Sequence, residues 1–217
     1  MVSNPFKRTK KDTNYDFSFY KSAPHRRKSR LEENFSQLET LLKKAEGRKI
    51  ALIGQPGAGK SSLLLKLTNG KCEPKPTIGQ GTDTTDWSSS SKPILCHQYD
   101  RIYFIDTPGY DTKAHPLKSY HEYFPFHCFD TVLFVIKGKV HQSDEEMLRL
   151  VMNKTRRTST VVLVRGYAED LTEEDRKSLE HEYSIKFKTE KHNLPFFFVS
   201  NRFGEGIAEL QACLNIK

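Results

Sequence analysis

The chain has 217 residues, of which 36% are hydrophobic and 29% charged, a balance typical of one soluble domain with an additional segment. No apolar run approaches the roughly 18 residues that a membrane-spanning helix needs. The opening MVSNPFKRTKK lacks the apolar core of a signal peptide. The four cysteines lie far apart without a C-x-x-C pair, which argues against a disulfide framework or a zinc ribbon. We therefore expect a cytoplasmic protein without a transmembrane segment.

The formal net charge of +8 is concentrated at the start of the chain. Nine lysines and arginines against two aspartates give residues 1–30 a net charge of +7, which leaves +1 for the other 187 residues. We interpret residues 1–28 as a basic, flexible arm. The arm is either a solubilising extension or a contact for a polyanion, such as an anionic membrane surface or RNA.

Residues 29–47 are predicted to form an amphipathic leading helix. Ser29 and Glu32 make a Ser-x-x-Glu capping box, and Gly47 ends the pattern. The apolar positions recur at helical spacing: Leu31, Phe35, Leu38 and Leu42. We expect this stripe to pack on the edge of the body; the alternative is a partner-binding face.

Residues 48–217 alternate between short apolar runs and amphipathic stretches. The runs that predict buried strands are 50–53, 102–105, 131–136, 160–164 and 195–199. The stretches that predict helices are 60–69, 142–153, 173–182 and 205–215. A strand near 94–99 is expected to pair antiparallel at the edge. This alternation predicts an α/β fold with three layers, in which helices cover both faces of a mostly parallel sheet.

The first predicted strand leads directly into Gly54-Gln55-Pro56-Gly57-Ala58-Gly59-Lys60-Ser61, which matches the phosphate-binding pattern G-x-x-x-x-G-K-[ST]. Glycines allow successive backbone N–H groups to surround a phosphate, and the following helix adds its positive dipole end. Lys60 is expected to contact the β- and γ-phosphates, and Ser61 to ligate Mg²⁺. Ser62 is expected to hydrogen-bond the α-phosphate. The sequence therefore predicts a nucleotide-binding protein.

A second element, Asp106-Thr107-Pro108-Gly109, follows the strand at 102–105. Asp106 can hold the Mg²⁺ through water, and the Gly109 N–H can reach a γ-phosphate. With both motifs, residues 49–216 resemble the translation-factor-related GTPases, in particular their Era-like, septin and immunity-related branches. The resemblance implies a P-loop NTPase fold (a G domain) with GTP or GDP as ligand and Mg²⁺ as cofactor.

The resemblance also implies a switch threonine between the two motifs, whose hydroxyl completes the Mg²⁺ shell. Residues 81–86 offer Thr82, Thr84 and Thr85, of which we favour Thr85.

The base-recognition element departs from the family pattern Asn/Thr-Lys-x-Asp. Aligned on the preceding strand, Tyr167 takes the lysine position and Glu169 the aspartate position, with Asp170 as a competitor for the base. We hypothesise that Tyr167 stacks on the base, and strict guanine selectivity stays an open question. Ser200 and Asn201 resemble the family turn whose backbone N–H meets the guanine oxygen.

Hydrolysis is expected to be slow. Many family members orient the attacking water with a glutamine immediately after the Asp-x-x-Gly element, and here that residue is Tyr110. Gly57 stands where some relatives carry the asparagine that recruits potassium, so we predict no potassium activation. We assign catalytic roles to Lys60, Thr85 and Gly109, and we expect a homodimer or an activating protein's arginine to accelerate turnover.

Two other functions stay open at this stage. One is a non-hydrolysing or dimerising assembly module in the manner of septins. The other is an Era-like RNA- or ribosome-associated factor that uses the basic arm.

A group of histidines follows the second motif. The group consists of His115, His121, His127 and Cys128, whose positions differ by six, six and one; none has the i, i+4 spacing of a zinc-binding pair. The spacing therefore does not predict a metal site. We interpret residues 109–127 as a segment that rearranges with the bound nucleotide.

Overall fold

The structure is a computed structural model, and it describes residues 27–79 and 86–216. Most of the basic arm and the three candidate switch threonines, Thr82, Thr84 and Thr85, lie outside the described residues. Within the described ranges, no helix has the length and apolar character that crossing a bilayer requires.

Six strands form one mostly parallel sheet in the order β2-β3-β1-β4-β5-β6. At the edge, β2 and β3 pair antiparallel, as the sequence predicts, and the other neighbouring strands of this sheet pair parallel. The strands are β1 (Arg48–Ile53), β2 (His97–Tyr99), β3 (Ile102–Asp106), β4 (Thr131–Ile136), β5 (Thr160–Arg165) and β6 (Phe196–Phe198).

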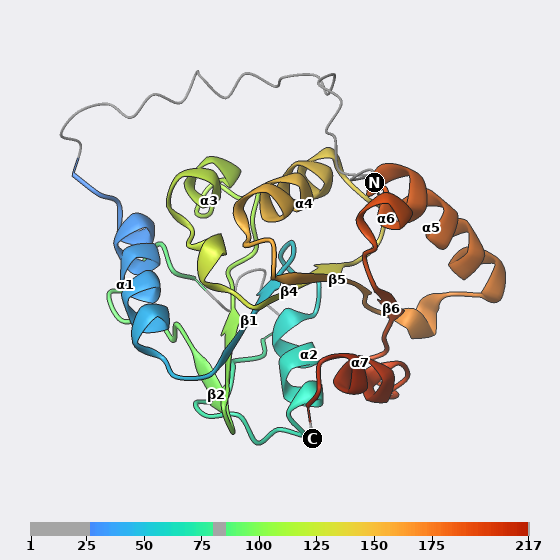
Figure 1. Ribbon diagram of the computed structural model, residues 1–217, viewed down its shortest axis with the longest axis horizontal. Coiled ribbons are helices and arrows are strands. Elements are labelled where there is room, and N and C mark those ends of the chain that lie inside the picture. Colours follow the sequence, from blue (N-terminus) through green and yellow to red (C-terminus); the bar gives the residue numbers. More distant parts are fainter. Residues whose placement is uncertain (1–26, 80–85, 217) are drawn as a thin grey trace, which may run out of the picture.

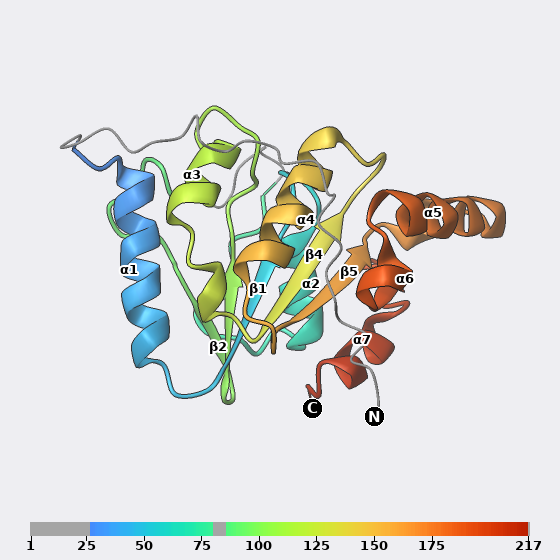
Figure 2. The same ribbon diagram turned by 45° about the horizontal axis from the view of Figure 1, so that its top comes forward.

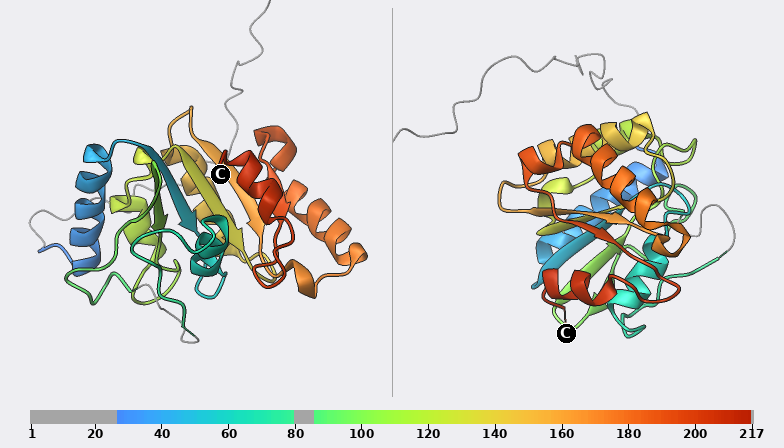
Figure 3. Two further views of the ribbon diagram at one scale, coloured as in Figure 1. Left: turned by 90° about the horizontal axis from the view of Figure 1, so that it is seen from below. Right: turned by 90° about the vertical axis from the view of Figure 1, so that its right-hand side faces the viewer.

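Helices cover both faces of the sheet. The α-helices are α1 (Arg30–Lys44), α2 (Lys60–Leu67), α3 (Leu117–Tyr123), α4 (Gln142–Lys154), α5 (Glu173–Lys186), α6 (Thr189–His192) and α7 (Ile207–Cys213), with short 3-10 helices η2 (Phe126–Cys128) and η3 (Ala168–Asp170). α2 and α7 lie together on one face, whereas α3 and α4 lie on the other (Figure 1 and Figure 3, left). α1 lies beside α3 at the edge (Figure 2). This arrangement is the expected three-layer α/β fold.

The alternation of side chains along a strand divides the core into two layers. In β1, Ile50 and Leu52 pack with α2 and α7, whereas Ala51 and Ile53 pack with α1, α3 and α4. All four side chains are buried. A central parallel strand is apolar on both faces because each face is covered by helices.

The leading helix α1 begins as predicted. Ser29 accepts a hydrogen bond from the Glu32 N–H, and the Glu32 carboxylate accepts one from the Ser29 N–H, which completes the capping box. Its apolar stripe faces the core, where Phe35 contacts the rings of Trp87, Tyr120 and Phe124. The stripe is therefore a packing surface in this structure.

The segment after the second motif is more ordered than the sequence indicates. Residues 117–123 form α3, and Tyr120, Phe124 and Phe126 are buried in the core beside α1. No apolar periodicity predicts this helix, because it is short and the aromatic residues of the segment extend into the following turn. A nucleotide-dependent rearrangement of residues 109–127 would therefore either keep these aromatic side chains in the core or expose them to solvent.

Candidate functional site

The two motifs meet at the carboxyl end of the central strand β1. β1 lies between β3 and β4. The chain leaves β1 toward α2 on one face of the sheet, whereas it leaves β3 and β4 toward α3 and α4 on the other face. Such a reversal point opens a crevice at the strand ends where α/β proteins bind ligands. Residues 54–59 cross this crevice between β1 and α2.

The loop requires glycine at defined positions. A Cβ on Gly54 would lie 2.3 Å from the Val135 carbonyl oxygen, which is too close for any side chain. Gly59 has a φ of +90°, in the left-handed region that favours glycine, and it directly precedes α2. The glycines therefore permit both the close packing on β4 and the turn into the helix.

Lys60 and Ser61 link the loop to the second motif. Lys60 is buried, and its Nζ donates hydrogen bonds to the carbonyl oxygens of Gly54 at 2.9 Å and Gln55 at 3.1 Å. The Ser61 hydroxyl donates to Oδ2 of Asp106 at 2.5 Å. The hydroxyl and the carboxylate that we expect around Mg²⁺ thus lie side by side. Oxygen ligands of this kind suit a hard cation.

Gly109 also lies against the loop. A Cβ at this position would come within 2.4 Å of the Pro56 backbone nitrogen. Residues 109–127, called here the second switch segment, therefore begin against the phosphate loop, and only glycine fits between the two.

A cavity of about 840 Å³ lies between α2, which follows this loop, and the altered base-recognition element. Its lining includes Ser62, Tyr167, Glu169, Asp170 and Asn201. The structure thus brings together the predicted residues for the α-phosphate and for the base.

Within this cavity, Glu169 and Asp170 differ in environment. The Glu169 Oε2 atom is buried and has no hydrogen-bond partner among the described residues, whereas Asp170 is exposed to solvent. A buried oxygen without a partner is costly unless a ligand donates to it. Of the two carboxylates that the sequence left as candidates, Glu169 has the environment of a ligand contact.

Tyr167 lies over the phosphate loop. Its hydroxyl donates to the Gly57 carbonyl oxygen at 3.2 Å, and the Lys137 ammonium lies 4.2 Å from the ring centroid. Asn201 makes a parallel contact, because its Nδ2 donates to the Gly59 carbonyl oxygen at 3.2 Å. Two side chains of the base region therefore hold the loop from the same side.

Ser200 differs from the other predicted contacts. Its side chain is fully buried, and its hydroxyl accepts the Phe203 N–H at 3.0 Å. The hydroxyl thus stabilises the turn that carries Asn201. Any contact between Ser200 and a base would come from the backbone of Ser200.

Tyr110 occupies the position of the family's water-orienting glutamine but is buried in the core. Its hydroxyl donates to Oδ1 of Asp144 at 2.5 Å, and the same oxygen accepts from Nε2 of Gln55 at 2.9 Å. Burial, reinforced by the Asp144 carboxylate, raises the pKa of Tyr110 well above its ordinary value. The phenol is therefore a neutral structural link between the second motif, α4 and the phosphate loop.

His115 forms a second link that the sequence analysis missed. Its buried Nε2 accepts the Trp87 N–H at 3.2 Å and lies 3.1 Å from Oδ1 of Asp86. Burial opposes ionisation of Asp86, but hydrogen bonds from Ser89 and Ser88 outweigh it and hold the pKa of Asp86 below its usual range.

Asn34 of α1 extends this network. Its Nδ2 donates to the carbonyl oxygens of Trp87 at 2.7 Å and Ser90 at 3.0 Å. The stretch that follows the candidate switch threonines is thus bonded both to the second switch segment and to the leading helix. Sequence spacing carries no signal for these contacts, because they join residues 28 and 53 positions apart.

Comparison with known proteins places these features in a family. Residues 49–165, more than half of the chain, match the family described as 50S ribosome-binding GTPase. No curated protein sequence matches the chain.

Several solved structures are similar. A bacterial selenocysteine-specific elongation factor, EF-Sec, has a TM-score of 0.56 at 17% identity, and the match covers 78% of this chain and 28% of that one. Era from Aquifex aeolicus, bound to GDP and aluminium fluoride, has a TM-score of 0.56 at 20% identity over 79% of this chain and 57% of that one. A probable GTP-binding protein, engB, has a TM-score of 0.55 at 14% identity over 77% of this chain and 96% of that one. At these identities the likeness shows a shared fold.

Proposed function

The chain belongs to the 50S ribosome-binding GTPase family, and on that premise we propose that this GTP-binding G domain is a slow GTPase that acts as a nucleotide-dependent switch. The observation that carries the proposal is the contact between Ser61 and Asp106, which joins the two nucleotide motifs at one point. We assign residues 48–217 to the G domain and residues 29–47 to a leading helix attached to it.

Mg²⁺ fits this point. Ser61 would ligate the ion directly, Asp106 would hold it through water, and Thr85, which lies outside the described residues, would complete the shell. The ion would neutralise charge on the β- and γ-phosphates. The chain's own residues bind the phosphates through the loop amides, place Lys60 along them and keep the Gly109 N–H free of side-chain obstruction.

Slow turnover follows from the burial of Tyr110. Phosphoryl transfer needs an oriented water, and the phenol is engaged with Asp144 inside the core. We propose that a second copy of the chain or an activating protein supplies the missing group, for example an arginine.

The switch output would pass through the network around His115. Ordering of residues 81–86 by the γ-phosphate would act on Asp86, which lies beside His115, and on Trp87. Trp87 donates its N–H to His115, and its carbonyl oxygen accepts a hydrogen bond from Asn34 of α1. The leading helix would then report the state of the nucleotide.

The proposal is tested by phosphate release from GTP over hours, with Lys60→Ala as the blank. We expect slow release above the blank, accelerated at high protein concentration if dimerisation supplies the missing group. Fast turnover at low concentration that Tyr110→Ala leaves unchanged would contradict it. Release equal to the blank, with GTP bound tightly, would favour the assembly module.

An Era-like RNA-associated function is favoured by one observation, the charge of +7 on residues 1–30. RNA binding through the arm would weaken steeply with salt, and deletion of residues 1–28 would remove that dependence. Vesicles containing anionic lipid test the membrane alternative in the same way. We further propose a cytoplasmic location for the protein. The four cysteines are free thiols in this structure.

A further inference from the structure

One group of side chains away from the nucleotide site combines the three ligand types that bind zinc. Within residues 27–79 and 86–216, the group consists of Glu39, His127 and Cys128. We propose that it is a Zn²⁺ site that fastens the leading helix α1 to η2, the short helix at the end of the second switch segment. The evidence for this site does not rest on the nucleotide function proposed above.

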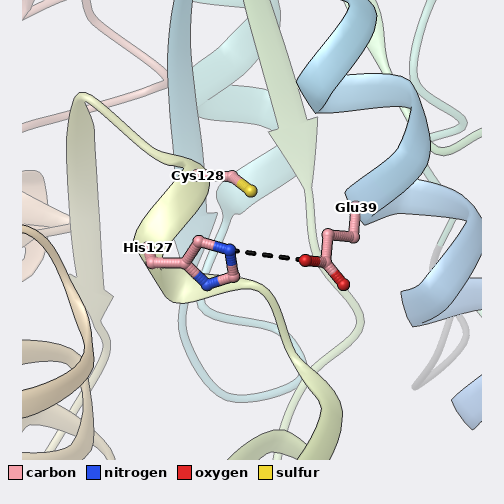
Figure 4. Close-up of side chains that lie close together, drawn as sticks. All are labelled: Glu39, His127 and Cys128. Atoms are coloured by element: carbon pink, nitrogen blue, oxygen red, sulfur yellow. Dashed lines mark ion pairs between the residues drawn. The ribbon is translucent and has the colours of Figure 1, made fainter.

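The ligand atoms are close enough to share one ion. One atom from each side chain lies within 4.8 Å of the other two, and Nε2 of His127 is 3.4 Å from Oε1 of Glu39. Tetrahedral Zn²⁺ with bonds of about 2.0–2.2 Å to nitrogen and oxygen holds such ligands about 3.4 Å apart. The sulfur would move by about 1 Å at most to reach its own bond length of about 2.3 Å. Figure 4 shows the three side chains directed toward the same space.

The backbone that carries these ligands is fixed by the core. Phe35 of α1 and Phe126 of η2 are both buried, and both rings pack against Phe124, with centroids 5.2 and 4.7 Å away. Each aromatic residue lies within four positions of a ligand. The two elements therefore hold the ligands at a set separation, which lowers the entropic cost of assembling the site.

The ligand set selects the metal. Thiolate and imidazole favour Zn²⁺ over Mg²⁺, which prefers oxygen ligands, so the Mg²⁺ that accompanies a nucleotide would not compete here. Glu39 and His127 also line a cavity of about 190 Å³. A fourth ligand of the ion would be water or a donor from another molecule.

One cation of the chain already occupies part of the space. The Lys43 ammonium lies 2.7 Å from Oε1 of Glu39, and its side chain is 63% exposed. An exposed lysine can swing into solvent at little cost, because an ion pair of this kind contributes about 0–1 kcal/mol. Zn²⁺ would therefore displace Lys43 from Glu39. Competition from the lysine would lower the affinity for Zn²⁺ but would not prevent binding.

The sequence alone could not indicate this site. Adjacent His127 and Cys128 form no known zinc spacing, and the third ligand lies 88 positions earlier on another element. Only the packing of α1 against η2 brings the three together.

Titration of the full chain with Co²⁺ after removal of metals with EDTA tests the proposal. We expect the visible absorption bands of four-coordinate Co²⁺ and a near-ultraviolet thiolate-to-Co²⁺ charge-transfer band, both removed by one equivalent of Zn²⁺ in the presence of excess Mg²⁺. Cys128→Ser should remove the charge-transfer band. His127→Ala and Glu39→Gln should each weaken Zn²⁺ binding by at least about tenfold.

Two further variants serve as controls. Cys213→Ser changes an exposed cysteine elsewhere and should leave every signal unchanged. Lys43→Met removes the competing ammonium and should tighten Zn²⁺ binding. Thermal unfolding in EDTA should be the same for wild type and Glu39→Gln, and added Zn²⁺ should raise the Tm of wild type more than that of Glu39→Gln. A wild-type chain without the charge-transfer band, or a band that survives Cys128→Ser, would overturn the proposal.

Discussion

The two halves of the nucleotide site are built from different parts of the chain. The phosphate half is made largely of backbone, with glycines that permit close approach and one lysine that spans the loop. The base half is made of side chains, chiefly Tyr167, Glu169 and Asn201. A backbone cradle tolerates little change, whereas a side-chain pocket can change its contacts without disturbing the fold. The family pattern is accordingly intact in the first half and altered in the second.

The largest expected effect lies in the phosphate half. Lys60→Ala removes the charge-assisted hydrogen bonds to the phosphates, each worth about 1.5–3 kcal/mol, and should weaken GTP binding about 100-fold. Isothermal titration calorimetry measures the affinity. Lys71→Ala, at an exposed lysine just beyond α2, is the matched control and should bind normally. A loss below about threefold for Lys60→Ala would mean that the loop does not hold the phosphates as described.

The next effect separates the two candidate carboxylates of the base half. Glu169→Gln replaces the buried acceptor with a partly donating amide and should weaken GTP binding about tenfold while leaving ATP binding unchanged. Asp170→Asn, at the exposed neighbour, should have little effect on either. The opposite result would assign the base contact to Asp170, and equal affinities of the wild type for GTP and ATP would remove guanine recognition from this loop.

The third effect is on stability, not on affinity, and concerns the support of the phosphate half. Tyr110→Phe deletes the buried hydrogen bond to Asp144 and should lower the free energy of unfolding by about 1–3 kcal/mol. Urea unfolding at unchanged m-value measures the loss. Tyr103→Phe, at a half-buried tyrosine whose hydroxyl bonds to none of the described residues, is the control. An unchanged stability would show that Asp144 and Gln55 are held in place without the phenol.

The smallest expected effect on nucleotide affinity concerns the contact between the base half and the phosphate half of the site. Tyr167→Phe keeps the ring over the loop and removes only the hydroxyl that donates to Gly57. A neutral hydrogen bond contributes about 0.5–1.5 kcal/mol, so GTP affinity should fall between about twofold and tenfold. Calorimetry with GTP and ATP in parallel should show the same loss for both, since the bond stabilises the loop that either nucleotide would use. A loss for GTP alone would place Tyr167 on the base.

Local patterns in the sequence predicted most of the fold. Short apolar runs predict the buried strands, and the capping box at Ser29 predicts the start of α1. α3 escaped prediction because its seven residues carry only one fully buried side chain, Tyr120. Its place depends on the rings of Phe35 and Phe124, which the chain brings near only after folding.

The site was predictable in proportion to its dependence on backbone. The phosphate loop and Asp106 can be predicted from motifs, because the geometry at each of these positions requires one residue type. The roles of Asp144, His115 and Asn34 could not be predicted, because they arise from contacts between distant elements. Tyr110 shows the limit most clearly, since only packing decides that its phenol turns into the core.

The hydrogen bonds from Asn34 to Trp87 and Ser90 have a practical consequence. A truncated version that starts at β1 would leave two carbonyl groups without their donor and would uncover the aromatic faces that Phe35 now covers. Such a fragment would tend to aggregate and would be marginally stable, even though its nucleotide motifs are complete. Anyone trimming this protein for crystallisation or binding assays should keep the chain from Ser29 onward.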